Sequence, residues 1–428
     1  MSQADWDRRQ YYSRKVKFFI AINRFNTDPQ VHPSTYFRIA QLQSSALLPS
    51  LRHLHYDLSD RSISHIFLFL SPLLDSLELS SIDGFGNTIA GPFLATLASK
   101  FQMLSRIVLS SGHISVDILK KSIVHFKQLR SLELTDAVFM SDFVLWEVLG
   151  TLPSLVNFTL TAYDPASHPA HAPENSNNQN GGPKYFEALE SLSVMGSFFL
   201  IQHLLGFIDS SCLKSINVYP IVNRVRNEHE PELTPSMTII ASKWSRSLKD
   251  LFIGSRPLAL SPHSNAISKS LMLLKDVQEM QDFQLLGWGL ENTDDDVRHL
   301  VMSWPKLTTF GLYSLQTCIS LSTLRIIAEN CPELRHLSIR LDTSTNPPFD
   351  ISSKSLRHNL EVLNQSVLAE VNPSDAITRT TLERQIQVAR HLDLIFPYLK
   401  SINAQRDDTT WSSIRDLVKL CQDARRVT

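Results

Sequence analysis

A short pattern of apolar residues returns along the whole chain and predicts a repeated strand. Six copies place a proline two residues before an apolar-x-x-apolar-x-apolar phrase, at Pro49, Pro72, Pro153, Pro305, Pro332 and Pro397. A wider search finds further copies, and the first apolar residues of the set are Leu51, Leu74, Leu104, Leu129, Leu155, Leu189, Leu213, Leu248, Phe283, Leu307, Leu334, Leu360 and Leu399. Most successive copies lie 23 to 30 residues apart.

The segments between the phrases have the apolar spacing of amphipathic helices. Residues 115–128 and 294–304 each place their apolar side chains on one helical face, and three aspartates start the second segment. A negative charge is favourable at a helix N-terminus, and the prolines end the preceding helices. A strand, a turn and a helix in about 25 residues is the leucine-rich-repeat unit. We therefore expect an α/β leucine-rich-repeat solenoid, a horseshoe with parallel strands on its concave face and helices on its convex face.

The repeats predict a division of the chain into a solenoid and two flanks. We expect the solenoid over residues 48–404, with a disordered insertion at 163–183, where Pro, Asn, Gly and other polar residues replace core-forming ones. Residues 1–47 are expected to form an N-terminal flank and cap. Residues 405–428 are expected to form a C-terminal capping helix, because Trp411, Ile414, Leu417, Val418 and Cys421 recur at helical spacing.

Composition and charge narrow the possible partners. The 428 residues carry a formal net charge of -1, which supplies no field to attract nucleic acid or an anionic membrane. The four cysteines are widely spaced, the N-terminus has no apolar signal region, and no apolar run is long enough to span a bilayer. We expect a protein of the cytoplasm, the nucleus or both, bound to neither nucleic acid nor membrane.

No strong catalytic, cofactor-binding or metal-binding signature is present. The chain lacks the glycine-rich, nucleophile-elbow and metalloprotease motifs. His53 and His55 face one side of a predicted strand without an evident third ligand, and Asp294–Asp296 are explained by a helix start. Cys331 is expected to be a small buried core residue. We expect no enzyme, no catalytic residues, no cofactor and no bound metal.

The default binding surface of such a solenoid is the strand face that its leucines do not use. Its side chains are mostly small and carry both signs of charge, without a basic stripe interleaved with aromatic residues, which favours a polypeptide partner. The candidate partner-binding residues are Arg52, His53, His55, Asp75, Glu78, Arg106, Arg130, Glu133, Asn157, Lys214, Asn217, Lys249, Phe252, Arg335 and His336.

Four segments make the chain resemble the fungal F-box proteins that carry a leucine-rich-repeat region. DWDRRQYYSRKVK (Asp5–Lys17) looks like the segment that follows the F-box, and LLPSLRHLHY (Leu47–Tyr56) looks like the first repeat. VARHLDLIFPYLKSINA (Val388–Ala404), followed by the Trp411 helix, looks like the closing repeat and cap. NCPELRHLSI (Asn330–Ile339) fits the cysteine-containing repeats of F-box adaptors.

The resemblance implies a substrate-recognition protein of a cullin-RING ubiquitin ligase, with a protein substrate on the concave face. The F-box module, with which such proteins dock onto the ligase adaptor subunit, is not visible in this sequence. A ligase adaptor is therefore expected as a partner only if an F-box lies upstream. The alternative is a leucine-rich-repeat scaffold unrelated to ubiquitin ligation. The terminal caps favour a monomer.

Overall fold

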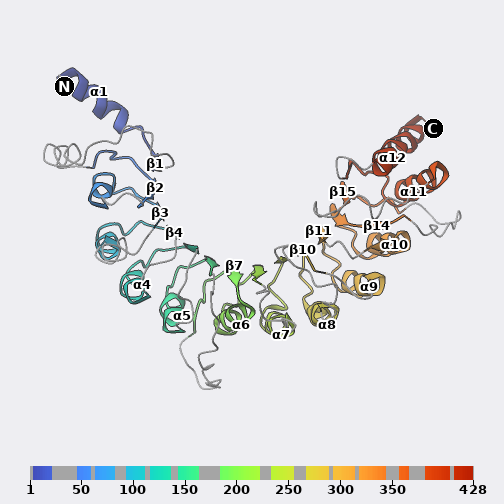
Figure 1. Ribbon diagram of the computed structural model, residues 1–428, viewed down its shortest axis with the longest axis horizontal. Coiled ribbons are helices and arrows are strands. Elements are labelled where there is room, and N and C mark those ends of the chain that lie inside the picture. The colour runs from blue at the N-terminus through green and yellow to red at the C-terminus, as the bar shows by residue number, and fades with distance from the viewer. Residues whose placement is uncertain are drawn as a thin grey trace. The chain divides into compact units, whose positions relative to one another are not determined.

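A computed structural model describes residues 3–21, 46–58, 63–81, 93–110, 116–135, 143–162, 184–221, 233–254, 267–288, 293–313, 318–343, 356–365, 381–404 and 409–427. The chain divides into two compact units, Met1–Cys212 and Leu213–Thr428. Within each unit, the strands lie side by side and the helices cover one side of them (Figure 1).

Among its described residues, the first unit has seven strands that pair in chain order, each parallel to the next. They are β1 (Phe18–Ala21), β2 (His53–Asp57), β3 (Ser76–Ser80), β4 (Arg106–Ser110), β5 (Ser131–Thr135), β6 (Asn157–Thr161) and β7 (Ser191–Gly196). The helices include α1 (Gln3–Ser13), α4 (Val116–Ile123), α5 (Phe143–Gly150), α6 (Phe198–Phe207) and the 3-10 helix η1 (Ile63–Leu68).

The second unit repeats this plan with its own parallel strands. They are, in spatial order, β8 (Ser215–Pro220), β9 (Asp250–Gly254), β10 (Asp282–Leu286), β11 (Thr309–Tyr313), β13 (His336–Ile339), β15 (Val362–Gln365) and β16 (Ser401–Asn403). A small second sheet pairs β12 (Ile319–Ser320) with β14 (Leu341–Asp342). The helices include α7 (Leu233–Trp244), α8 (Ile267–Met272), η3 (Leu273–Asp276), α9 (Thr293–Ser303), α10 (Leu321–Asn330), α11 (Leu382–Ile395) and α12 (Thr409–Val427).

One hydrogen-bond device holds successive repeats in register. The carbonyl of the residue before a strand accepts two backbone N–H groups of the next repeat. The Thr308 carbonyl, for example, accepts from Arg335 at 2.9 Å and from His336 at 3.1 Å, and the Arg335 carbonyl accepts from Glu361 at 2.9 Å and from Val362 at 3.0 Å. Because the same step recurs in both units, side chains at equivalent positions stand in rows across the strands.

The apolar phrase supplies the core, as its spacing predicts. β3 and β5 bury alternate residues, and all thirteen landmark residues of the repeated phrase are buried. Pro305, Pro332 and Pro397 each come two residues after the end of α9, α10 or α11, which confirms that they follow helix ends. Together with the parallel register, this confirms the predicted α/β leucine-rich-repeat solenoid fold.

The predicted helices are confirmed where they are described. α9 begins at Thr293, buries Val297, Leu300 and Val301, and holds three aspartates in its first turn. Besides its favourable charge at the N-terminus of α9, Asp294 also binds residues at the start of the next helix. Its Oδ1 accepts hydrogen bonds from the Ser320 backbone N–H at 2.9 Å and from the Thr323 hydroxyl at 2.8 Å, so it also ties down the start of α10.

The predicted register is wrong in one repeat. The sequence pattern predicts Phe283 as the first apolar position of this repeat, but Phe283 pairs with Leu251 and Phe310, which occupy the second position of their repeats. The first position belongs to Met280, which is fully buried. Phe283 is the first residue of another apolar-x-x-apolar-x-apolar match, FQLLGW, and a sequence pattern alone does not separate two overlapping matches.

The two ends of the described chain add elements to the solenoid. Residues 1–47, expected to cap the N-terminal end, contribute β1, which pairs in parallel with β2. Near the C-terminal end, α12 packs against α11 and buries Trp411, Ile414 and Val418, and its role as a cap stays a prediction. The expected insertion at 163–183 lies outside the described residues.

Candidate functional site

The strand face is the set of side chains on the repeats' strands, and on the residue before each strand, that the core does not use. All fifteen predicted partner-binding residues lie on it and are exposed or half-buried, nine in the first unit and six in the second. Not every position expected there is open, however. Val108 and Ser338 are 4% and 2% exposed, and Gly311 is also buried. The face is therefore interrupted by positions that cannot offer a side chain to a partner.

In the first unit, several charges on this face are paired with one another. His55 Nδ1 lies 3.4 Å from Glu78 Oε1, and Arg106 Nη2 lies 3.5 Å from Glu133 Oε2. A further carboxylate, that of Asp75, accepts a 2.6 Å hydrogen bond from the Ser105 hydroxyl through its Oδ1. These neighbours on adjacent strands reduce the charge that the first unit offers to a partner.

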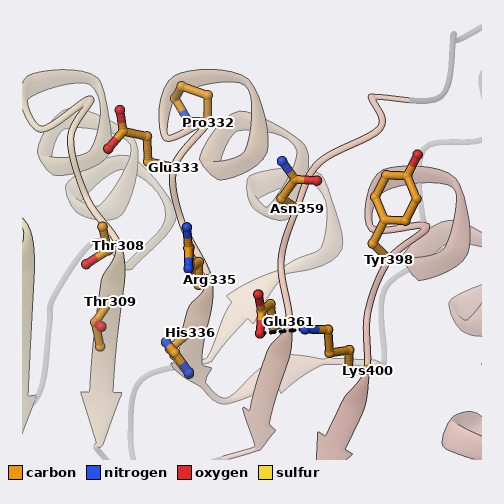
Figure 2. A pocket seen from close by; sticks show the side chains of 10 residues that line it. All are labelled: Thr308, Thr309, Pro332, Glu333, Arg335, His336, Asn359, Glu361, Tyr398 and Lys400. Carbon is orange, nitrogen blue, oxygen red and sulfur yellow. Dashed lines mark hydrogen bonds and ion pairs between the residues drawn. The ribbon is translucent and has the colours of Figure 1, made fainter.

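In the second unit, the strand face contains a groove of about 840 Å³ at the amino-terminal ends of its last strands. It crosses four repeats, because its lining comes from the starts of β11, β13, β15 and β16 and from the turns before them (Figure 2). The groove is lined by Thr308, Thr309, Pro332, Glu333, Arg335, His336, Asn359, Glu361, Tyr398 and Lys400.

Two of the groove's charges neutralise each other. Lys400 Nζ donates to Glu361 Oε2 at 2.9 Å across adjacent strands (Figure 2). The hydrogen bond from Lys400 and its charge lower the pKa of the Glu361 carboxyl, and Arg335 and His336 add smaller effects of the same sign. Glu361 is therefore ionised and engaged at neutral pH.

Arg335 is left with an open guanidinium group. The residue is exposed, and no carboxylate of the described residues forms an ion pair with it within 4.0 Å. Figure 2 shows the Glu333 carboxylate up in the preceding turn, directed away from Arg335. His336 lies beside Arg335 and Tyr398 stands 55% exposed at the far side of the groove, so donors and one aromatic ring border the open space.

The same face of the second unit carries two carboxylates in direct register on neighbouring strands. Asp250 on β9 is the register partner of Asp282 on β10. Gln284 Nε2 donates to Asp282 Oδ1 at 2.9 Å, which orients that carboxylate. Burial and the negative charge of Asp282 raise the pKa of Asp250, and Lys249 opposes them. Among the described residues, no cation lies within ion-pairing distance of either aspartate.

Two aromatic rings lie farther along the same face, Phe252 two residues beyond Asp250 on β9 and Tyr219 at the end of β8, next to Gly254. The ring centroids of Tyr219 and Phe252 are 5.0 Å apart, and both side chains are half-buried on the strand face. A glycine provides the room, since a Cβ on Gly254 would meet Phe252 Cε1 at 2.5 Å and Tyr219 Cδ1 at 3.1 Å. We call Tyr219, Asp250, Phe252, Asp282 and Gln284 the acid–aromatic patch.

The interior groups with shifted pKa values have structural roles. The Cys331 thiol is fully buried and lies 3.6 Å from the carbonyl oxygens of Val301 and Trp304, and burial raises its pKa to about 12. His358 accepts from the Leu360 N–H through Nδ1 at 3.1 Å, so its Nε2 donates to the Cys331 carbonyl at 2.7 Å. Cys331 is the buried core cysteine that the sequence predicted.

Neither a metal cluster nor a membrane-spanning helix is found in the described part of the chain. No three His, Cys, Asp or Glu side chains of that part come together as a metal site requires. None of its helices combines the length and the apolarity needed to cross a bilayer.

Sequence reasoning identified part of this surface and missed the rest. It named Arg335, His336, Phe252 and Lys249. It missed Asp282 and Gln284 because the register of that repeat was wrong, and it missed Glu361 although Leu360 marked the start of its repeat. The groove residues Pro332, Glu333, Asn359 and Tyr398 lie in the turns before the strands, outside the strand positions to which the predicted binding face was confined. A search for the residues that flank each strand would have found them.

Comparisons with known proteins find similar solved structures only. No protein-family model matches the chain, and no curated protein matches it. The yeast complex of Rad7 and Elc1 matches at 16% identity and a TM-score of 0.40, over 77% of this chain and 79% of that one. A leucine-rich-repeat protein of Leptospira interrogans matches at 13% identity and a TM-score of 0.28, over 83% and 91%. A Bacteroides fragilis protein matches at 14% identity and a TM-score of 0.35, over 66% and 68%.

Proposed function

We propose that this chain is a protein-interaction module that holds a partner polypeptide against the strand face of its second unit. The observation that carries the proposal is the groove bordered by Arg335, His336 and Tyr398, whose side chains the core does not use. A repeat fold buries each unit against its neighbours and leaves an extended face of side chains to bind a partner. The proposed role is binding, without catalysis and without a cofactor or metal.

The proposed partner is the substrate of a ubiquitin ligase, with this chain as the substrate-recognition part of an F-box type adaptor. Support comes from the sequence, in which Asp5–Lys17, Leu47–Tyr56 and Val388–Ala404 resemble fungal F-box proteins with leucine-rich repeats. A ligase adaptor subunit would join the complex through an F-box, if one precedes these residues. A leucine-rich-repeat scaffold unrelated to ubiquitin ligation is the second candidate.

The remaining properties of the proposal follow from charge and composition. The net charge of -1 and the acidic groups of the second unit oppose binding to nucleic acid or to anionic lipid. We propose that the protein acts as a monomer in the cytoplasm, the nucleus or both.

Co-purification mass spectrometry with matched variants tests the proposal. The pair Arg335→Gln and Tyr398→Ser alters the groove, whereas Met302→Ser removes an exposed apolar side chain of α9, outside the strand face. We expect the tagged wild-type chain to retain a selective set of proteins that the groove variant loses and the Met302 variant keeps. A set that all three proteins retain equally would contradict the proposal.

The same experiment separates the two candidate functions. A ligase adaptor subunit and a cullin that co-purify with a longer form of the gene product containing an F-box would support the ligase role. Selective partners that depend on the groove, without ligase subunits in any form, would support the scaffold.

A further inference from the structure

We infer that the strand face of the second unit recognises an extended peptide that carries a basic side chain and, about three to four residues away, an acidic side chain. The acid–aromatic patch would hold the basic side chain and Arg335 the acidic one. This inference rests on the proposed function, and it adds the chemistry of the partner.

The basic side chain of the peptide is inferred from two carboxylates, those of Asp250 and Asp282, that form no ion pair among the described residues. Asp250 and Asp282 stand directly across from each other on parallel strands, an arrangement that destabilises a sheet when both are ionised. Lys249 is the neighbouring cation, but it makes no ion pair within 4.0 Å with either carboxylate in the part of the chain that the structure describes. A lysine or arginine of a partner placed between the two carboxylates would balance them.

The rings of the patch favour the same occupant. Phe252 lies two residues beyond Asp250 on the same face of β9, and its half-buried ring lies 5.0 Å from that of Tyr219, next to Gly254. An aromatic face attracts a cation, and its apolar surface also covers the methylene groups of a lysine or arginine stem. Carboxylates and rings together are therefore complementary to a basic side chain, and neither suits an acidic one.

The acidic side chain follows from the groove. Lys400 is engaged by Glu361 at 2.9 Å, so Arg335 is the groove cation left open among the described lining residues. A guanidinium group binds a carboxylate through two parallel N–H···O bonds. The exposed imidazole of His336 stands next to it as a further donor (Figure 2).

The strand order sets the distance between the two side chains. Arg335 precedes β13, which is two strands from β10 and three from β9. Neighbouring strands are about 4.8 Å apart, so the two subsites are about 10–14 Å apart across the sheet. An extended chain advances about 3.3 Å per residue, which gives the spacing of about three to four residues.

A random linear peptide library displayed on phage tests the inference. We would select binders with the wild-type protein, with Asp250→Asn combined with Asp282→Asn, and with Arg335→Gln. Arg325→Gln combined with Glu329→Gln is the matched control, because it neutralises one base and one acid on α10, outside the strand face. Synthetic copies of the selected peptides would then be titrated against all four proteins.

We expect wild-type binders to be enriched in Lys or Arg and in Asp or Glu at the stated spacing. The double aspartate variant should lose the basic enrichment and bind the wild-type peptides about ten-fold or more weakly, while Arg335→Gln should lose the acidic enrichment. The control should behave as the wild type. Neutralising Asp250 removes its repulsion with Asp282, so we expect the aspartate variant to stay folded. Thermal melts of each variant would show whether weaker binding comes from unfolding.

Three results would overturn the inference: binders without a basic residue, binders whose affinity the aspartate variant leaves unchanged, or no enriched peptide at all. The proposed function would survive each of them if groove-dependent partners still co-purified. If the groove variant instead retained the same co-purifying partners as the wild type, the proposed function itself would be wrong.

Discussion

Asp250 and Asp282 face each other in register on adjacent parallel strands, and burial together with the charge of Asp282 raises the pKa of the Asp250 carboxyl. The arrangement is unfavourable for the free protein, because two like charges directly across a sheet repel each other. Surfaces selected for binding often retain groups that reduce stability. The pair therefore links the stability of the free protein to its proposed partner.

Asp250→Asn should stabilise the free protein. Removal of the repulsion should raise the free energy of unfolding by about 0.2–1 kcal/mol at neutral pH. Because the folded-state pKa of Asp250 lies above the ordinary value of 3.8, the favourable contribution of its protonated form is lost as the pH rises through that folded pKa. Denaturant titrations of both proteins at several pH values measure this.

The difference in the free energy of unfolding between Asp250→Asn and the wild type should shrink below the folded-state pKa of Asp250, because the aspartic acid and the asparagine are then both neutral. An advantage that is independent of pH, or a variant less stable than the wild type at neutral pH, would contradict the like-charge interpretation.

Gly254→Ala should disturb the aromatic rings while leaving the fold largely intact. Its new Cβ would lie 2.5 Å from Phe252 Cε1, a ring atom that can swing aside on the open face. We expect a stability change within about 1 kcal/mol, because the loss of glycine's backbone entropy cost offsets part of the strain. Binding of a basic peptide should weaken. Thermal melts and peptide titrations measure the two effects.

Gly206→Ala is the control for this substitution. A Cβ on Gly206, in α6, would meet nothing within 4 Å, so alanine should stabilise by about 0.5–1 kcal/mol. A large loss of stability in the Gly254 variant would mean that the rings are fixed in the core and unsuited to a ligand.

Leu132→Ala should destabilise the first unit by about 2–5 kcal/mol, because the residue is 1% exposed and the mutation leaves a cavity. Leu132 is in register with Ile107 on β4 and Phe158 on β6. Hydrogen exchange should therefore accelerate most in these neighbouring strands, as expected for nearest-neighbour packing in repeats. An unchanged melting temperature would contradict the assignment of Leu132 to the core. Hydrogen exchange that accelerates equally along the whole chain would contradict destabilisation confined to neighbouring repeats.

The stability of the second unit should fall as the pH decreases below 6.5. Burial lowers the pKa of both His358 and His391 from that ordinary value. Between 6.5 and the folded-state pKa values, the unfolded chain binds more protons than the folded one, so stability decreases as the pH drops. His358→Gln should show a shallower pH dependence, although it is less stable overall. An identical slope in denaturant titrations would show that His358 does not contribute.

The sequence predicted the fold well at positions where one residue type has one structural role. Leucine at the repeated positions and proline after the helices are determined by local sterics and burial, and both can be read from spacing alone. The sequence did not identify Met280 as the first position of its repeat, because a methionine stands there in place of the usual leucine. Phe283, Leu286 and Trp288 match the apolar-x-x-apolar-x-apolar pattern equally well three residues later. A side-chain period of two means that such an error reassigns every residue of the strand.

The binding surface was less predictable, for a different reason. Arg335 could be named from its place in one repeat. That it remains open depends on Glu361 being engaged by Lys400, and this is a relationship between two other repeats. The pairing of Asp250 with Asp282 likewise requires the register of two strands 32 residues apart.

Site-specific photo-cross-linking tests the central claim, that a partner polypeptide lies on the strand face of the second unit. A photoreactive phenylalanine analogue would replace Tyr398 in the groove, and in a second protein it would replace exposed Met302 on α9. We expect irradiation in cell extract to give a discrete polypeptide adduct at position 398, reduced by Arg335→Gln, and none at position 302. Equal adducts at both positions, or an adduct at position 302 alone, would contradict the account.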